Sequence, residues 1–327
     1  MLFRSFFQRH CAPALPDRAE IILDIGRNNA GRRLPATDVE PCKQGCTVDR
    51  HRQCLAVRGC AEKAGGPIND GLLTLGISSR NVGDATNQLR GNISVDMARK
   101  DWGGARALGL PITMHTSGPS PITLLEKAGL LGPDVQLVHP LLTTAEERKI
   151  LARRGVSYSM SPVGESQRPA AAGVIQLGEL LEAGVKVSMS IDLTGTYTVD
   201  FFQCMRFLYH LHRHRIGARI PLTAKRLVQL ATLDGAVDLN IADRTGSITP
   251  GKRADIILVR TTDVNMALMA DPYETLVNMA QPRNVDTVIA DGRVLLRGGR
   301  FTALDHAAVV RDAAQSGADL LARAKAG

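Results

Sequence analysis

Short runs of apolar and β-branched residues recur along the middle of the chain, each bounded by glycine or proline. These runs lie at residues 72–78, 111–115, 135–139, 156–160 and 185–192. Their length and composition predict buried strands. The segments between them carry apolar residues at helical spacing, at residues 94–108, 122–131, 144–154 and 173–183. Strands that alternate with helices in this way predict an α/β protein with a parallel sheet.

The pattern changes toward the C-terminus. Helical spacing continues at residues 201–215 and 223–236, after which strand-like runs appear at 256–259 and 285–290. Asp291 and Gly292 follow, and Asp-Gly between two apolar runs is a strong signal for a hairpin. We therefore expect an antiparallel sheet in this region.

These patterns divide the chain into four parts, at residues 1–70, 71–243, 244–305 and 306–327. The first part shows neither a period of two nor a period of 3.6, apart from a strand-like run near residues 19–25. The second part carries the strand-helix alternation, the third the later strands, and the fourth an amphipathic helix.

Three of the central runs end in a side chain that can bind a metal: His115, His139 and Asp192. A barrel of eight strand-helix units in about 250 residues has roughly 31 residues per unit, which places all three at the carboxyl ends of nearby parallel strands. That rim carries the catalytic groups of such barrels. A lone histidine after a strand is usually a hydrogen-bonded core residue, but three such groups at the rim favour a site. Imidazole and carboxylate suit zinc first, with iron or manganese as alternatives.

The number of predicted strands is too small for a complete barrel. Five barrel strands are evident, whereas a closed (β/α)8 barrel of the triosephosphate isomerase type needs eight, and the missing units need roughly 90 residues. Only about 70 residues lie upstream. We expect a (β/α)8 barrel that is incomplete or distorted.

The motifs around these positions resemble the amidohydrolase superfamily, in its cytosine-deaminase and triazine-chlorohydrolase-like branch. They are Met114-His115, Val138-His139-Pro140, Ser159-Met160-Ser161-Pro162 and Ile191-Asp192, followed by Leu230–Ala236 and Gly246–Asp255. The last two segments are the more specific part of the resemblance, which covers about residues 72 to 301. It implies a small β-sandwich, built from both chain ends, beside the barrel.

The resemblance also implies roles for individual residues. His115 and Asp192 would bind one divalent metal ion, and Asp192 would accept the proton of the attacking water. His139 would contact the reacting oxygen of the substrate. The implied activity is metal-dependent hydrolysis of a non-peptide carbon–nitrogen bond in a small molecule, such as a heterocyclic or cyclic amide or amidine.

The sequence departs from the family pattern at two places. No His-x-His pair precedes His115, and Gly118 stands where the family has a glutamate that moves a proton. Glu165 is expected on the loop after the predicted strand at 156–160. Both Glu165 and Ser161 are candidates to face the substrate. The alternative for Glu165 is a solvated position on this loop. The His-x-His of residues 210–214 lies within a helical run, where residues two apart point in different directions, and is interpreted as surface histidines.

Charge and hydropathy argue against a nucleic-acid-binding protein and against a membrane protein. The net charge of +8 is spread along the chain, and its densest patch, residues 213–219, lacks the aromatic residues that a single-strand nucleic-acid platform needs. No apolar run approaches the roughly 18 to 20 residues that span a bilayer, and the N-terminus does not have the pattern of a signal peptide. We expect a cytoplasmic protein that binds neither nucleic acid nor membrane. The sequence leaves a homo-oligomer open.

Three hypotheses follow. The first is the metal-dependent hydrolase. The second is a catalytically inactive relative that keeps the pocket as a binding module. The third is that residues 1–70 are a damaged or misread beginning, so that the remainder is a fragment of an enzyme.

Overall fold

The structure is a computed structural model that describes residues 20–25, 73–83, 93–116, 120–139, 141–168, 173–192, 198–215, 220–268 and 270–326. The expectations for residues 1–70, apart from the strand near 19–25, therefore lie outside the described residues, as does Gly118.

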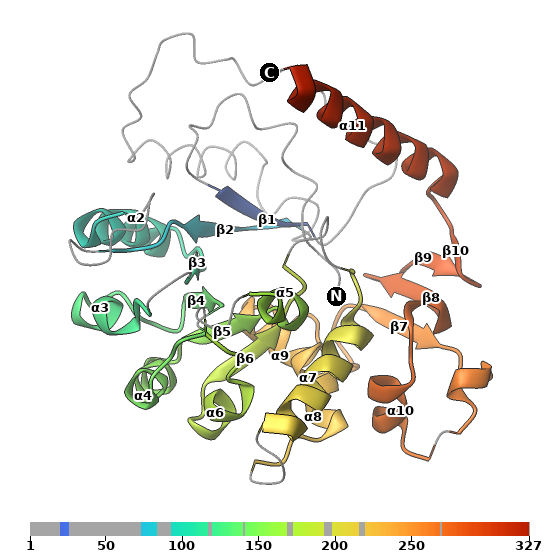
Figure 1. Ribbon diagram of the computed structural model, residues 1–327, viewed down its shortest axis with the longest axis horizontal. Coiled ribbons are helices and arrows are strands. Elements are labelled where there is room, and N and C mark those ends of the chain that lie inside the picture. Colours follow the sequence, from blue (N-terminus) through green and yellow to red (C-terminus); the bar gives the residue numbers. More distant parts are fainter. Residues whose placement is uncertain are drawn as a thin grey trace.

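A six-stranded sheet forms the centre of the fold, with the strands in chain order (Figure 1). The strands are β1 Glu20–Ile25, β2 Leu73–Ser79, β3 Ile112–His115, β4 Val135–Val138, β5 Ser157–Met160 and β6 Lys186–Met189. β2 to β6 are parallel, as predicted. β1 forms where a strand was expected, and it pairs antiparallel with β2 at the end of this sheet.

Helices cover one face of the sheet in the order of the strands (Figure 1). They are α2 Val95–Ala107, α3 Ile122–Lys127, α4 Ala145–Arg154 and α6 Leu177–Glu182. Their N-termini follow capping rules, since the Ser94 hydroxyl accepts from the Met97 N–H and Thr144 forms a capping box with Glu147. The only tryptophan of the chain, Trp102, is fully buried on α2 and donates from Nε1 to the Ser79 hydroxyl on β2, over 2.9 Å.

Along β3 and β4, buried apolar residues alternate with partly buried ones. Ile112 and Met114 are buried, and Thr113 between them donates a hydrogen bond to Gln136 Oε1 over 3.0 Å. Gln136 in turn donates to Asp238 Oδ2 over 2.5 Å, and the Ser188 hydroxyl donates to the same oxygen. Burial raises the pKa of the Asp238 carboxyl, although these donors act in the opposite direction.

Most of the predicted helices form, with changes at their ends. α7 spans Phe201–Arg215, as expected. The helix expected at 223–236 is divided into α8 Ala224–Leu230 and α9 Leu233–Asp238, because Thr232 leaves the helical region with φ −128° and ψ −89°. The helix expected at 173–183 begins only at Leu177. Two short helices were not predicted, α5 Pro162–Ser166 and α10 Pro272–Asn278.

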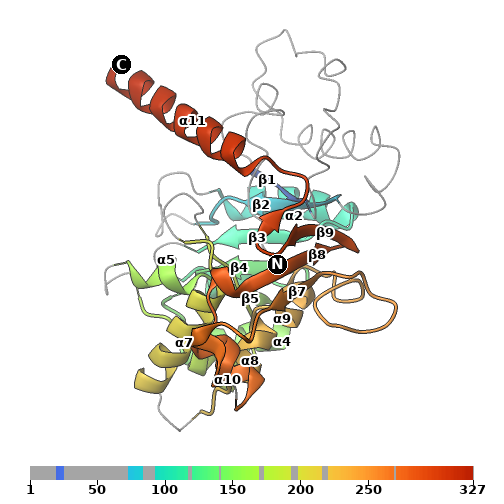
Figure 2. The same ribbon diagram turned by 90° about the vertical axis from the view of Figure 1, so that its right-hand side faces the viewer.

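A second sheet of four antiparallel strands, in the order β10-β9-β8-β7, follows in the chain. Its strands are β7 Ile256–Val259, β8 Val285–Ala290, β9 Arg293–Arg297 and β10 Arg300–Phe301, and the Asp291-Gly292 turn joins β8 to β9 as predicted. This sheet lies to the right of the central sheet in Figure 1 and in front of it in the turned view of Figure 2. All of its described strands come from the C-terminal part of the chain.

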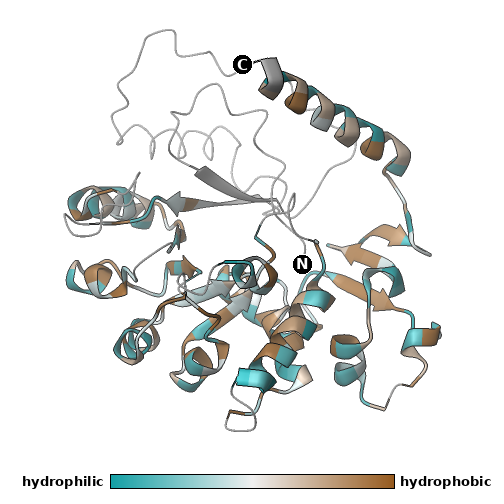
Figure 3. Ribbon diagram, in the orientation of Figure 1, coloured by the Kyte–Doolittle hydropathy of each residue, from teal (hydrophilic) through white to brown (hydrophobic). Residues whose placement is uncertain are grey.

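The last helix, α11 His306–Ala326, extends away from both sheets (Figures 1 and 2). Hydrophobic and hydrophilic residues alternate along it (Figure 3). Among the described helices, none is both long and apolar enough to cross a membrane.

Candidate metal centre

His115 is the last residue of β3, and the segment after it is tied to β4. Both the N–H and the hydroxyl of Thr116 donate to the Val138 carbonyl, each over 2.8 Å. Thr116 is buried. These two bonds keep the ends of β3 and β4 together, so that His115 lies beside the residue that follows β4.

His139 is that residue, and its backbone is left-handed, with φ 62°. Such a conformation is uncommon for a residue other than glycine and turns the chain away from the strand direction. The imidazole is buried, and its ring centroid lies 5.5 Å from that of His115. Its Nδ1 atom lies 2.8 Å from Glu165 Oε1 and 3.2 Å from the Ser161 hydroxyl.

Asp192 follows β6 in the same conformation, with φ 58°. Its Oδ2 atom lies 3.6 Å from Nε2 of His139, and its side chain is 12% exposed. The carboxylate therefore faces the histidines and keeps some contact with solvent.

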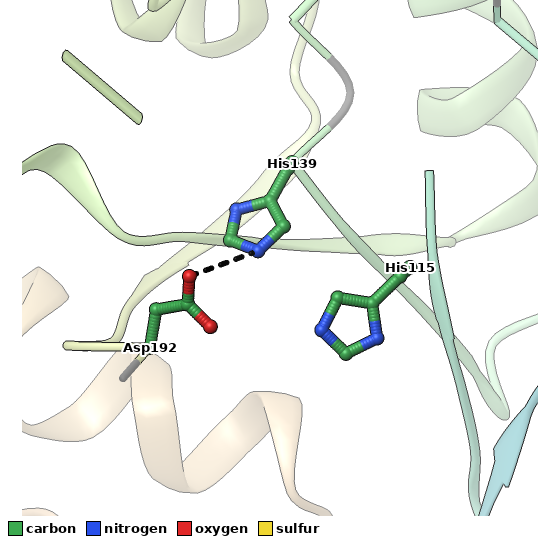
Figure 4. Close-up of side chains that lie close together, drawn as sticks. All are labelled: His115, His139 and Asp192. Atoms are coloured by element: carbon green, nitrogen blue, oxygen red, sulfur yellow. Dashed lines mark ion pairs between the residues drawn. The ribbon is translucent and has the colours of Figure 1, made fainter. Parts of the chain in front are cut away.

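The structure brings together His115 at the end of β3, His139 after β4 and Asp192 after β6 (Figure 4). One ligand atom of each lies within 4.8 Å of the others. Nε2 of His139 is buried and makes no hydrogen bond within the described part of the chain. Two imidazoles and a carboxylate are a donor set that zinc accepts, and catalytic zinc sites use three protein ligands. The residues present therefore fit a divalent metal ion.

Glu165 and Ser161 belong to the same cluster, on the far side of His139. Glu165 lies on α5 and is 3% exposed, so the interpretation as a solvated loop residue is wrong. Its Oε1 atom accepts from the Ser161 N–H over 2.9 Å as well as lying against His139. Tyr158 is also buried. Burial, and to a smaller extent the charge of Glu165, raise the pKa of the Tyr158 hydroxyl well above its ordinary value.

Two residues near the site were not singled out from the sequence. Thr116 joins β3 to β4, and Ser190 donates from its N–H to the Met160 carbonyl over 2.7 Å, which joins β6 to β5. The available signal was a hydroxyl residue within two positions of His115 and of Asp192. The surface interpretation of His212 is wrong, because its side chain is buried and Nε2 lies 2.6 Å from the Ile220 carbonyl.

Comparison with known proteins agrees with this geometry. A model of the amidohydrolase family matches residues 108–295, which is more than half of the chain. The chain therefore belongs to the amidohydrolase family, and the resemblance inferred from its motifs is confirmed.

Similar sequences are deaminases. A 5-methylthioadenosine/S-adenosylhomocysteine deaminase from Desulforudis audaxviator is 33% identical over 205 residues, which are 62% of this chain and 47% of that protein. A 5'-deoxyadenosine deaminase from Methanothermobacter thermautotrophicus is 34% identical over 207 residues, which are 63% and 48% of the two chains. The chain thus spans about half the length of these relatives.

Solved structures share the fold. An adenosine deaminase from Xanthomonas campestris with bound zinc has a TM-score of 0.64 and 25% identity, over 68% of this chain and 54% of that chain. An atrazine chlorohydrolase from Arthrobacter aurescens complexed with zinc has a TM-score of 0.67 and 20% identity, over 81% and 59%.

Proposed function

We propose that this protein is a metal-dependent hydrolase of a carbon–nitrogen bond, a deaminase acting on the amino group of an adenine-type nucleoside. The convergence of His115, His139 and Asp192 carries this proposal, since three ligand atoms within 4.8 Å can hold one divalent cation. The substrate class is supported by similar proteins that are named as deaminases of 5-methylthioadenosine, S-adenosylhomocysteine and 5'-deoxyadenosine.

We further propose that β2 to β6 are the later strands of a (β/α)8 barrel. Parallel strands in chain order, with helices on one face, support this assignment. So do the fold neighbours. In such a barrel the three candidate ligands lie at the carboxyl ends of the strands, where substrates bind.

His115 and Asp192 would hold a divalent ion, zinc first because both fold neighbours contain zinc. When bound, this ion lowers the pKa of a water molecule and polarises the bond that breaks. Asp192 would accept the proton of that water on a carboxylate oxygen. Its partial exposure lets water reach this oxygen. His139 directs Nε2 toward the same position and would contact the reacting oxygen of the substrate there.

A second candidate is a binding module without catalytic activity. It is favoured by Gly118, which occupies the position where the resembled family has a proton-moving glutamate, because glycine has no group that titrates. The two candidates agree on metal binding and differ only on turnover.

Metal analysis combined with an ammonia-release assay tests both candidates. The full chain is purified with zinc, and 5-methylthioadenosine, S-adenosylhomocysteine and 5'-deoxyadenosine are supplied as substrates. We expect one bound metal per chain, lost in His115→Ala, and a decrease in ammonia release of about 10²- to 10⁴-fold in Asp192→Asn. His210→Ala, on the exposed side of α7, is the control. Bound metal without ammonia release supports the binding module, and a chain that binds no metal contradicts both.

A further inference from the structure

Glu165 is a charged residue in an unusual place. Its side chain is completely buried, and its Oε1 atom lies on the side of the His139 ring that faces away from Asp192 and His115. The other carboxylate oxygen, Oε2, is also buried and has no hydrogen-bond partner among the described residues. Burying a carboxylate costs free energy unless it is hydrogen-bonded. Packing alone therefore does not explain why a carboxylate is buried at this position.

The hydrogen bonds at Oε1 determine where the His139 proton lies. The Ser161 N–H can only donate, and it points to this oxygen over 2.9 Å, so Oε1 is an acceptor. Nδ1 of His139 lies 2.8 Å from the same oxygen. An unprotonated Nδ1 would place its lone pair against the oxygen, which is repulsive. The shorter contact, to Glu165, therefore assigns the proton to Nδ1, which donates it to Glu165, and the Ser161 hydroxyl oxygen, 3.2 Å from Nδ1, is then a second acceptor.

This proton fixes the chemistry of the other ring nitrogen. In a neutral imidazole only one nitrogen carries hydrogen, so Nε2 has a free lone pair when Nδ1 is the donor. Nε2 is buried, makes no hydrogen bond within the described part of the chain, and faces Asp192 Oδ2 at 3.6 Å. A buried lone pair beside a carboxylate and a second imidazole is suited to a cation.

We propose that Glu165 is a positioning residue, which holds His139 with its proton on Nδ1 and thereby makes Nε2 the third protein ligand of the metal. This inference rests on the proposed function and replaces two expectations from the sequence. His139 binds the ion instead of the substrate, and Glu165 acts through His139 instead of facing the substrate. Carboxylate–histidine pairs of this kind typically raise metal affinity about 10- to 100-fold.

Metal affinity in Glu165→Gln tests the proposal without relying on turnover. Glutamine has nearly the same shape, but its neutral oxygen is a weaker acceptor for the Nδ1 proton. We expect Co²⁺ and Zn²⁺ to bind about 10- to 100-fold more weakly. The visible absorption of bound Co²⁺ should change as well, because one nitrogen ligand is weakened.

Glu147→Gln is the matched control. Glu147 is also buried and accepts from the Thr144 N–H over 2.9 Å and from the Thr123 hydroxyl over 3.3 Å, remote from His139. Glutamine can keep its capping box. We expect metal affinity equal to that of the wild type. An equal loss of affinity in both variants would contradict the proposal, since it would reflect loss of a buried charge in general.

Nitrogen NMR of the unaltered chain provides a second measurement that needs no stable variant. With ¹⁵N-labelled histidine, the His139 signals should show a protonated Nδ1 and an unprotonated Nε2, and Zn²⁺ should shift Nε2. A proton on Nε2 would overturn the proposal. If metal is lost in His115→Ala but unchanged in Glu165→Gln, the proposed function stands and this inference fails. If the wild type binds no metal, both fail.

Discussion

Nε2 of His139 lies 3.6 Å from Oδ2 of Asp192, and both residues have a left-handed backbone, with φ 62° and 58°. Each comes directly or shortly after the end of a parallel strand. Left-handed backbone is unfavourable for most residues but tolerated by asparagine and aspartate. The two side chains meet because the chain turns in this way at both positions.

Asp192→Asn and Asp192→Ala should differ in stability for this reason. Both remove the carboxylate, but only alanine is poorly suited to a φ of 58°. We expect the alanine variant to unfold about 1 kcal/mol more easily than the asparagine variant. Urea denaturation of the two variants measures the difference. Equal stabilities would mean that the backbone conformation at this position carries no strain.

Zinc should stabilise the folded chain. A ligand that binds only the folded state adds about 2.7 kcal/mol when its concentration is 100 times its Kd. For a chain of 327 residues this corresponds to an increase in Tm of roughly 4 °C. Differential scanning fluorimetry with zinc, and again after a chelator, measures it. His115→Ala should show no increase, and an increase of the same size in that variant would place the bound zinc elsewhere.

Gly173 should not tolerate a side chain. Its φ is 101°, and a Cβ atom would lie 2.4 Å from the backbone oxygen of Leu141, whose N–H donates to the His139 carbonyl. We expect Gly173→Ala to lose more than about 2 kcal/mol of stability and to bind metal more weakly. Gly103→Ala is the comparison, since it lies within α2 with open space around it and should gain about 0.5 to 1 kcal/mol. Thermal unfolding of the two variants measures the change in stability of each. Equal changes would show that a Cβ atom at residue 173 does not clash with Leu141.

Asp238 should make stability depend on pH. Burial raises the pKa of its carboxyl, so the folded chain holds the proton at pH values where the unfolded chain has released it. The stability that this bound proton contributes is fully present below the ordinary aspartate pKa of about 3.9. It is lost as pH rises through the raised pKa of the folded state. We expect the stability of Asp238→Asn relative to the wild type to increase as pH rises from about 4 through the raised pKa of Asp238. Denaturation at several pH values measures it; a constant difference would mean that Asp238 is ionised throughout.

The hydrophobic pattern predicted the central elements well because their signals are local. α7 has the predicted bounds, and the bounds of α2 and α4 lie within one residue of the predicted ones. The division between α8 and α9 was missed, because neither glycine nor proline marks Thr232. The pairing of β1 depends on β2, far along the chain, and its local sequence carries no information about that partner.

The candidate site was predicted in part. Strand ends and residue types were enough to bring His115, His139 and Asp192 together. The orientation of Glu165 was not predictable, because it depends on α5, a helix of five residues that begins with proline. Nor does sequence alone indicate which side of an imidazole a carboxylate approaches.

Trp102 gives this protein an internal fluorescent reporter. The chain has a single tryptophan, and it is fully buried between α2 and β2, bound to Ser79. Its emission therefore reports on the contact between α2 and β2 and should shift to longer wavelength when α2 separates from that strand. A red shift that precedes the loss of helical circular dichroism would show that this contact opens before the rest of the molecule unfolds.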